Sequence, residues 1–227
     1  MLPLHWFLIS PCPLCGQDPE GPKPAPGHAC RACCERLELP EEGLMGVDPL
    51  PWWGAGRYGG GLRHLLLDLR RRPRIEAVAA LARGTRRALA TSVDPQQLRT
   101  WCERPLLVPI PSWKRRANPL PPLFCRALER GGDFRRLDLL ERSRPVLGQH
   151  HLGRNLRIAN QAGAFRCLRP PGPGEARRRP VLIVDDILTT GATTTSAARC
   201  LAAAGWRVEG VLCLARTGAR EAERAVP

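Results

Sequence analysis

The stretch VLIVDDILTTGATTT, residues 181–195, decides the expected fold. Its first four residues are aliphatic, which is typical of a buried parallel strand and predicts one over Val181 to Val184. Two carboxylates and the Thr-rich loop Ile187 to Thr193 follow. The Ala-rich residues 194–204 and Gly205 then predict a helix and its C-terminal cap. The stretch therefore predicts a strand–loop–helix unit with a charged loop between its two elements.

The charged loop has the residue types of a site for ribose 5-phosphate. The first turn of a helix offers N–H groups and the positive end of its dipole, where a phosphate is favoured. Two adjacent carboxylates can accept hydrogen bonds from the vicinal hydroxyls of a ribose. The candidate phosphoribosyl-binding residues are Asp185, Asp186, Thr189, Thr190, Gly191, Ala192 and Thr193. The alternative is that the two aspartates only end the strand and cap the helix, as Asp often does.

The same residues resemble the 5-phosphoribosyl 1-diphosphate signature of type I phosphoribosyltransferases, in which a hydrophobic strand, Asp-Asp and Thr-Thr-Gly-x-Thr follow in order. The resemblance implies an α/β fold of the type I phosphoribosyltransferase kind, a parallel sheet flanked by helices on both faces. It also implies displacement of diphosphate from the anomeric carbon, with mainly electrostatic stabilisation of the transition state. Asp185 and Asp186 are then the catalytic candidates, holding the ribose hydroxyls directly or with Mg²⁺. A Walker loop and a dinucleotide fingerprint are excluded, because Gly-Lys-[Ser/Thr] and three spaced glycines are absent.

Two C-x-x-C pairs near the N-terminus predict a structural zinc site. Fourteen residues separate the pairs, and each pair can turn two sulfurs toward one tetrahedral ion. The expected ligands are Cys12, Cys15, Cys30 and Cys33. Cys34 competes with Cys33, His28 is a minor competitor, and disulfides are the alternative in an oxidising compartment. The Pro- and Gly-rich loop between the pairs would be held mainly by the metal.

Basic and amide side chains follow a second expected strand, Leu106 to Ile110. Lys114, Arg115 and Arg116 come after its end, which in a parallel sheet is the edge where ligands bind, and three cations there suit a diphosphate. A solvated basic turn is the alternative. Downstream, residues 143–165 have few core-forming side chains and predict a mobile polar flap over a charged substrate. Its candidate ligand contacts are Gln149, Arg157 and Asn160.

Four features together resemble the ComF family of competence-associated phosphoribosyltransferase-like proteins. They are the paired cysteines, Val108 to Pro111 with Arg115 and Arg116, the Gln-His-x-Leu segment leading to Arg157, Asn160, Ala164 and Phe165, and the loop Asp185 to Thr193. The resemblance implies a role in natural competence, with single-stranded DNA and the helicase machinery of DNA uptake as partners. After the strand that corresponds to Leu106 to Ile110, the family usually has Arg-Gly-Phe-Asn-Gln, whereas this chain has Arg116-Ala117-Asn118-Pro119. Since that Gly lets the backbone approach a diphosphate, ligand binding is better supported than transfer.

Length and charge bound the remaining possibilities. The 227 residues suit one ordinary domain plus a small appendage, expected as a zinc module over 1–48 and a phosphoribosyltransferase-like domain over 49–227. The first residues match neither a signal peptide nor a membrane span, so a cytoplasmic protein is expected.

The net charge of +14 suits nucleic acid, and the stretch Arg144 to Arg179 could form one basic surface with Lys114 to Arg116. Because almost all basic residues are arginine, genome composition is the alternative explanation. The two functional hypotheses are a phosphoribosyltransferase and a non-catalytic single-stranded-DNA-binding adaptor that keeps the phosphoribosyl pocket.

Overall fold

The chain folds around a mixed sheet that is mostly parallel. A computed structural model describes residues 11–18, 25, 27–92, 103–112, 117–143 and 163–218. The six-stranded sheet has the order β1-β2-β8-β7-β3-β4, in which only β1 runs antiparallel to its neighbour. Its strands are β1 (Leu44–Gly46), β2 (Trp52–Arg57), β8 (Val208–Arg216), β7 (Val181–Leu188), β3 (Leu106–Pro109) and β4 (Arg135–Arg136). A second sheet pairs β5 (Leu140–Arg142) with β6 (Phe165–Cys167).

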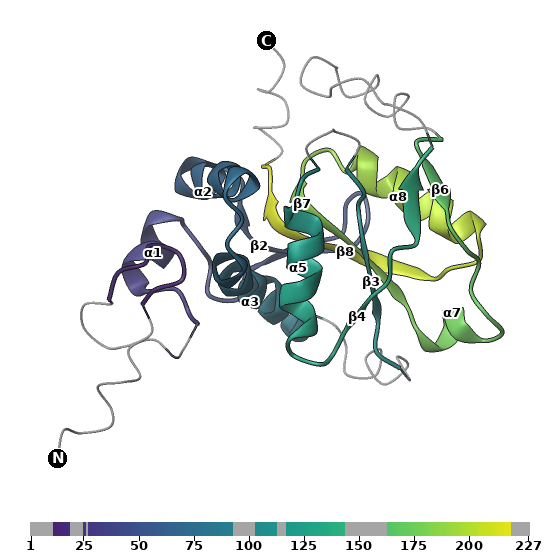
Figure 1. Cartoon of the computed structure of the whole chain (residues 1–227), viewed down its shortest axis with the longest axis horizontal. Helices are drawn as coiled ribbons and strands as arrows, with labels where there is room; N and C mark the ends of the chain where they lie inside the picture. The colour runs from purple at the N-terminus through teal and green to yellow at the C-terminus, as the bar shows by residue number, and fades with distance from the viewer. Residues whose placement is uncertain are drawn as a thin grey trace, which may run out of the picture.

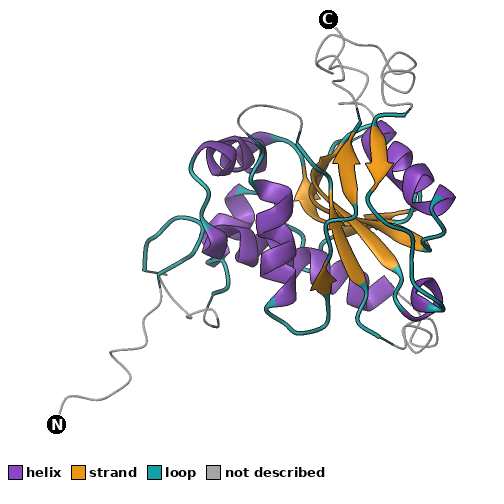
Figure 2. Cartoon of the chain, turned by 45° about the vertical axis from the view of Figure 1, so that its right-hand side comes forward, coloured by secondary structure: helices purple, strands orange, loops and turns teal. Residues whose placement is uncertain are grey.

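Helices cover the two faces of the large sheet (Figures 1 and 2). One face packs against α2 (Gly60–Arg71), α3 (Ile75–Ser92) and α5 (Leu120–Glu129), and the other packs against α8 (Ala192–Ala203). The short helix α7 (Glu175–Arg178) precedes β7, within a segment that the sequence predicts to be only a loop. In the described residues, none of the helices combines the length and the apolar character needed to span a bilayer. The α/β prediction of a sheet with helices on both faces is thus confirmed at this level.

The central strands form where the sequence is most apolar. All four residues of β3 and the first four residues of β7 are buried, so both faces of these strands pack against other elements. The strand expected over Leu106 to Ile110 is present as β3. The helical spacing of Leu62, Leu65, Leu66 and Leu69 before Pro73 also predicts a helix, and α2 lies there. In α2, Leu62, Leu66 and Leu69 are fully buried and lie on one face of the helix.

The strand β7 is longer than the sequence predicts, which corrects the expected charged loop. It continues through Asp185 and Asp186 to Leu188, pairing with β8 as far as Arg216. The alternation of burial after Val184 explains the error, because a strand that is buried on both faces at first becomes half-exposed without ending. Both carboxylates therefore have the fixed backbone of a sheet, and only residues 189–191 form the loop before α8.

The N-terminal segment packs onto the same core as the sheet. The helix α1 (Arg31–Arg36) follows Cys30, and Leu14, Cys33 and Leu37 belong to the buried cluster that includes α2 and α3. Arg74, after α2, donates to the carbonyl oxygen of Leu14 at 3.4 Å. The strand β1 lies before the expected domain boundary at residue 48 and pairs with β2 of the sheet. The division at residue 48 stays a prediction.

Candidate functional site

The carboxyl half of β7 carries the two candidate carboxylates at the edge where parallel strands end. Since side chains alternate along a strand, Asp186 lies on the face of Leu182 and Val184, toward α2 and α5. The carboxylate of Asp185 accepts the backbone N–H of Asp186 at 2.9 Å. Although the two aspartates are adjacent in the sequence, their side chains therefore lie in different surroundings and have different hydrogen-bond partners.

Asp186 is buried and already has two hydrogen-bond donors. The residue is 2% exposed, and its Oδ2 accepts Arg70 Nε at 2.7 Å and Asn118 Nδ2 at 2.8 Å. Although partial burial of Arg70 opposes its charge, the hydrogen bond that it donates to Asp186 raises the pKa of the guanidinium. Asn118 also accepts the N–H of Leu120 at 3.1 Å, so it joins the start of α5 to β7. Asp186 thus fixes α2 and the segment after β3 against the signature strand.

Asp185 is half-buried, and within the described residues its carboxyl group forms no ion pair. Burial and the nearby charge of Asp186 raise the pKa of Asp185 from an ordinary 3.8 to about 8, while Arg70 lowers it only in part. A protonated carboxyl group can both donate and accept hydrogen bonds. Of the pair, Asp185 is the more exposed residue.

The loop between β7 and α8 ends at Gly191, where the helix begins. Gly191 is the N-cap of α8 with φ 75°, a left-handed conformation that favours glycine. A Cβ atom here would collide with the ring of Pro49, which packs against this glycine. The hydroxyl of Thr194 and the N–H of Thr195 both donate to the carbonyl of Gly191, at 3.0 and 2.8 Å. The loop is therefore held by its contacts with α8 and with the β1–β2 connection.

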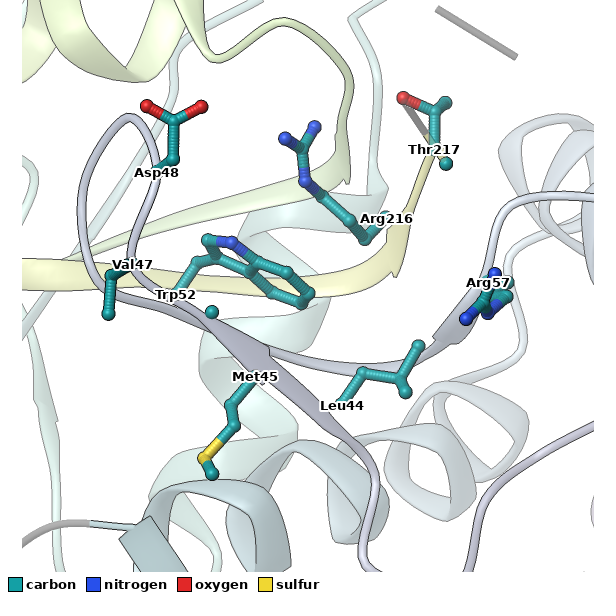
Figure 3. Close-up of a pocket in the computed structure, with 10 residues that line it drawn as sticks. Leu44, Met45, Val47, Asp48, Trp52, Arg57, Arg216 and Thr217 are labelled. Atoms are coloured by element: carbon teal, nitrogen blue, oxygen red, sulfur yellow. The ribbon is translucent and has the colours of Figure 1, made fainter. Parts of the chain in front are cut away.

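A groove of about 450 Å³ adjoins this loop (Figure 3). Its walls come from β1, the start and end of β2 and the end of β8: Leu44, Met45, Gly46, Val47, Asp48, Trp52, Arg57, Arg216, Thr217 and Gly218. Arg216 lies over the Trp52 ring at 5.5 Å and donates to the carbonyl of Leu188 at 3.0 Å, which links the groove to the end of β7. Figure 3 shows Asp48 and Arg216 pointing to the same side of the ribbon. Within the described residues, the buried hydroxyl oxygen of Thr217 has no hydrogen-bond partner.

Four cysteine sulfurs gather at the N-terminal end of the fold. The sulfurs of Cys12, Cys15, Cys30 and Cys33 all lie within 4.8 Å of one another and could hold a metal ion such as zinc. The cluster contains Cys33 and not Cys34, and His28 is not part of it. Burial opposes ionisation of Cys12, but N–H donors, first of all that of Cys30, lower its pKa to about 6. Cys12 and Cys15 lie on one turn, and Cys30 and Cys33 lie at the start of α1.

Known proteins resemble this chain over most of its length. It is 30% identical over 218 residues to the DNA utilization protein YhgH of Salmonella typhimurium strain LT2, covering 92% of this chain and 85% of that protein. This chain belongs to the ComF-like family. The YhgH protein of Escherichia coli strain K12 is 28% identical over 226 residues, covering 94% of this chain and 92% of its own length. No protein-family model matches the chain.

Several expected site residues of this ComF-like chain lie outside the described residues. They are Lys114, Arg115 and Arg116 after β3, and Gln149, Arg157 and Asn160 in the expected flap. The two ends of that flap are held side by side by β5 and β6, and the N–H of Ser143 donates to the carbonyl of Ala164 at 3.1 Å. The flap and the diphosphate contacts stay predictions.

The ComF-like site also includes residues that the sequence did not single out as ligand-binding. Arg70 and Asn118 reach Asp186 from other elements, and Arg142 of β5 donates to the carbonyl of Pro111 at 3.1 Å. Arg142 also lies over the Phe165 ring at 4.4 Å. Asn118 follows the basic residues Lys114 to Arg116, and Arg142 lies two residues after Leu140, so neither stands in a pattern that marks it as ligand-binding. Nothing local marks Arg70, which is one of four consecutive or near-consecutive arginines.

Proposed function

We propose that this ComF-like protein binds 5-phosphoribosyl 1-diphosphate, or a related ribose 5-phosphate, at the carboxyl end of β7, and that it serves DNA uptake in natural transformation. The main support for this ligand is the left-handed Gly191 at the start of α8, just after a strand that carries two aspartates. Residues 189–193 would hold the 5-phosphate at the positive end of the α8 dipole. The relatives named for DNA utilization support the biological role.

The two aspartates would divide the work on the ribose. Asp185 would face the vicinal hydroxyls and would help to hold Mg²⁺, which is commonly bound by one or two carboxylates plus phosphates. Asp186 would keep Arg70 and Asn118 in place beside the ligand. The groove along Trp52 and Arg216 would receive whatever is attached to the ribose.

A second candidate function is ligand binding without transfer. The side chain of Asp186 is 3% exposed and engaged by Arg70, so one of the two catalytic candidates does not face solvent. The sequence after β3 also lacks the glycine that would let the backbone approach a diphosphate. The protein would then act as a non-catalytic adaptor for single-stranded DNA and the uptake helicase, with the phosphoribosyl ligand as a bound regulator.

We also propose that the cysteine cluster holds one structural Zn²⁺. Four thiolates within 4.8 Å suit the closed tetrahedral sites in which zinc has no open position. The ion would fix the turn after Cys12 to α1 and so complete the surface that packs on α2 and α3. It takes no part in the proposed ligand site.

Thermal unfolding with added ligand tests the phosphoribosyl proposal. Because a ligand that binds only the folded state stabilises it by mass action, 5-phosphoribosyl 1-diphosphate with Mg²⁺ at a hundred times its Kd should add about 2.7 kcal/mol. For a domain of this size, this corresponds to a rise in Tm of about 5 to 10 °C. Ribose 5-phosphate should also raise the Tm, whereas ribose without phosphate should not. An equal rise with inorganic diphosphate alone would contradict a site built for the sugar phosphate.

A further inference from the structure

Most of the expected basic surface over Arg144 to Arg179 is neutralised where the structure describes it. Arg166 pairs with Glu141, Arg169 pairs with Glu175, and both Arg178 and Arg179 pair with Glu103. A guanidinium that already holds a carboxylate must give up that partner before it binds a phosphate. This part of the chain is therefore a weaker candidate for a nucleic-acid surface than the sequence suggests.

Apart from Arg70, which pairs with Asp186, the arginines of α2 and its C-cap have no such partners in the described residues. Arg63, Arg71 and the C-cap residue Arg72 are exposed and form no ion pair with a carboxylate in the described ranges. The single acidic residue of α2, Asp68, pairs with Arg74 at 3.8 Å. Elsewhere such arginines occur singly on their elements, for example Arg199 on α8.

Stability of the helix explains only part of this charge. Arg71 and Arg72 lie at the C-terminus, where cations interact favourably with the helix dipole. Arg63 lies near the N-terminus, where a cation opposes the dipole, and the first turn of α2 has no acidic residue. The unpaired charge thus lies near both ends of the helix, with Arg63 near its start and Arg71 and Arg72 at its end.

This basic helix lies beside the proposed ligand site. Arg70 in its last turn donates to Asp186 at 2.7 Å, and Arg57, at the end of β2 just before the helix, lines the groove. Arg57 is exposed and pairs in register with Arg216 of β8. Figure 1 shows α2 at the outer edge of the molecule, next to the end of β8. Arg57 therefore connects the groove, which it lines, to the start of the basic helix.

We propose that Arg63, Arg71 and Arg72, with Arg57, form the phosphate-binding surface for single-stranded DNA. The inference rests on the proposed role in DNA uptake and names the surface that makes the contact. A single strand fits better than a duplex because only an unpaired base can enter the groove, whose rim carries Met45, 59% exposed, and Val47, 82% exposed. These arginines would bind the phosphates of the backbone, and they are not interleaved with exposed aromatic rings on which bases could stack. The preference for particular base sequences should therefore be small.

Fluorescence anisotropy with a labelled mixed-sequence oligonucleotide tests this surface. For single strands the slope of log affinity against log salt is about −0.7 for each neutralised phosphate. The variant Arg63→Gln, Arg71→Gln, Arg72→Gln should therefore lose about two units of slope and about two orders of magnitude of affinity near 0.1 M salt. Its affinity for 5-phosphoribosyl 1-diphosphate should be unchanged, so a failure of the ligand proposal is seen separately in the parent protein.

A matched variant removes the same charge from paired arginines. Arg31, Arg130 and Arg166 are at least 48% exposed and pair with Glu35, Glu76 and Glu141. Changing all three to Gln should leave most of the affinity and slope, since exposed ion pairs contribute little to folding. An equal loss in both variants, or full affinity in the α2 variant, would overturn the assignment. Tighter binding of duplex DNA or single-stranded RNA of equal length would overturn the choice of partner.

Discussion

A Cys12→Ser, Cys15→Ser variant will hold no zinc and will lose the structure of its N-terminal module, whereas the parent keeps one ion per chain. The physical reason is that removing two of four thiolates leaves a site that cannot close around the ion. Structural zinc contributes about 10 to 16 kcal/mol of apparent binding free energy in small zinc-binding peptides near neutral pH. The segment around the cysteines has only a few buried side chains of its own, so it cannot replace that contribution by packing.

The effect should extend into the main domain. Because Leu14, Cys33 and Leu37 pack with the core of α2 and α3, losing the module exposes that surface and should lower the free energy of unfolding by about 2 kcal/mol or more. Elemental analysis gives the zinc content, and urea unfolding gives the stability. Cys34→Ser is the matched control, since Cys34 lies outside the cluster. Retention of zinc in the double variant, or its loss in the control, would refute the ligand set.

Asp186→Ala should destabilise the fold by about 3 kcal/mol, because it leaves Arg70 and Asn118 without their shared acceptor in a buried site. The two donors lie 2.7 and 2.8 Å from the same oxygen, which is 116 residues from Arg70 in sequence. Adding Arg70→Ala to this variant should cost little more, since the pair acts as a unit. Asp68→Ala is the control on the same helix. It breaks an exposed pair at 3.8 Å and should cost less than about 1 kcal/mol. Equal costs for Asp186→Ala and Asp68→Ala would contradict the structural role of Asp186.

Replacing the neighbouring Asp185 should have the opposite effect and stabilise the fold. The pKa of Asp185 is raised to about 8 in the folded protein, so the folded state holds its proton where the unfolded state has lost it. The stability contributed by that proton is fully present below about pH 4 and is lost as the pH rises toward about 8. Asp185→Asn removes this dependence and should gain stability relative to the parent between about pH 5 and about pH 8.5. Urea midpoints of the two proteins that stay parallel over this range would contradict the assignment.

Local patterns predicted the elements that depend on local sequence. The apolar runs of β3 and β7, the leucine spacing of α2 and the cysteine pairs are all visible within short windows, and the structure confirms the strands, the helix and the gathering of the cysteines. The predicted end of β7 at Val184 was wrong, because the local sequence does not distinguish a carboxylate in a strand from one in a loop. Pairing with β8, which holds Ile187 and Leu188 in the sheet, is a tertiary contact that a single strand does not show.

The candidate site shows the same division more sharply. Asp185, Asp186 and Gly191 could be named from one motif, but the partners of these residues come from distant parts of the chain. Arg70 reaches Asp186 from α2, and Pro49 covers Gly191 from the β1–β2 connection. Such contacts are set by how the elements pack, so no spacing rule could identify them. The ion pairs that neutralise the arginines near α7 are hidden from sequence reasoning for the same reason.

Calorimetric titration of 5-phosphoribosyl 1-diphosphate with Mg²⁺ tests the central claim most directly, in the parent and in the Asp185→Asn, Asp186→Asn variant. Asn at position 186 keeps an amide oxygen for Arg70, so the variant should remain folded, which near-ultraviolet circular dichroism can verify. One site per chain is expected in the parent. Binding in the variant should be weaker by about 1.5 to 3 kcal/mol, because charge-assisted hydrogen bonds are lost. No binding to the parent, or undiminished binding to a folded variant, would contradict the proposed phosphoribosyl site.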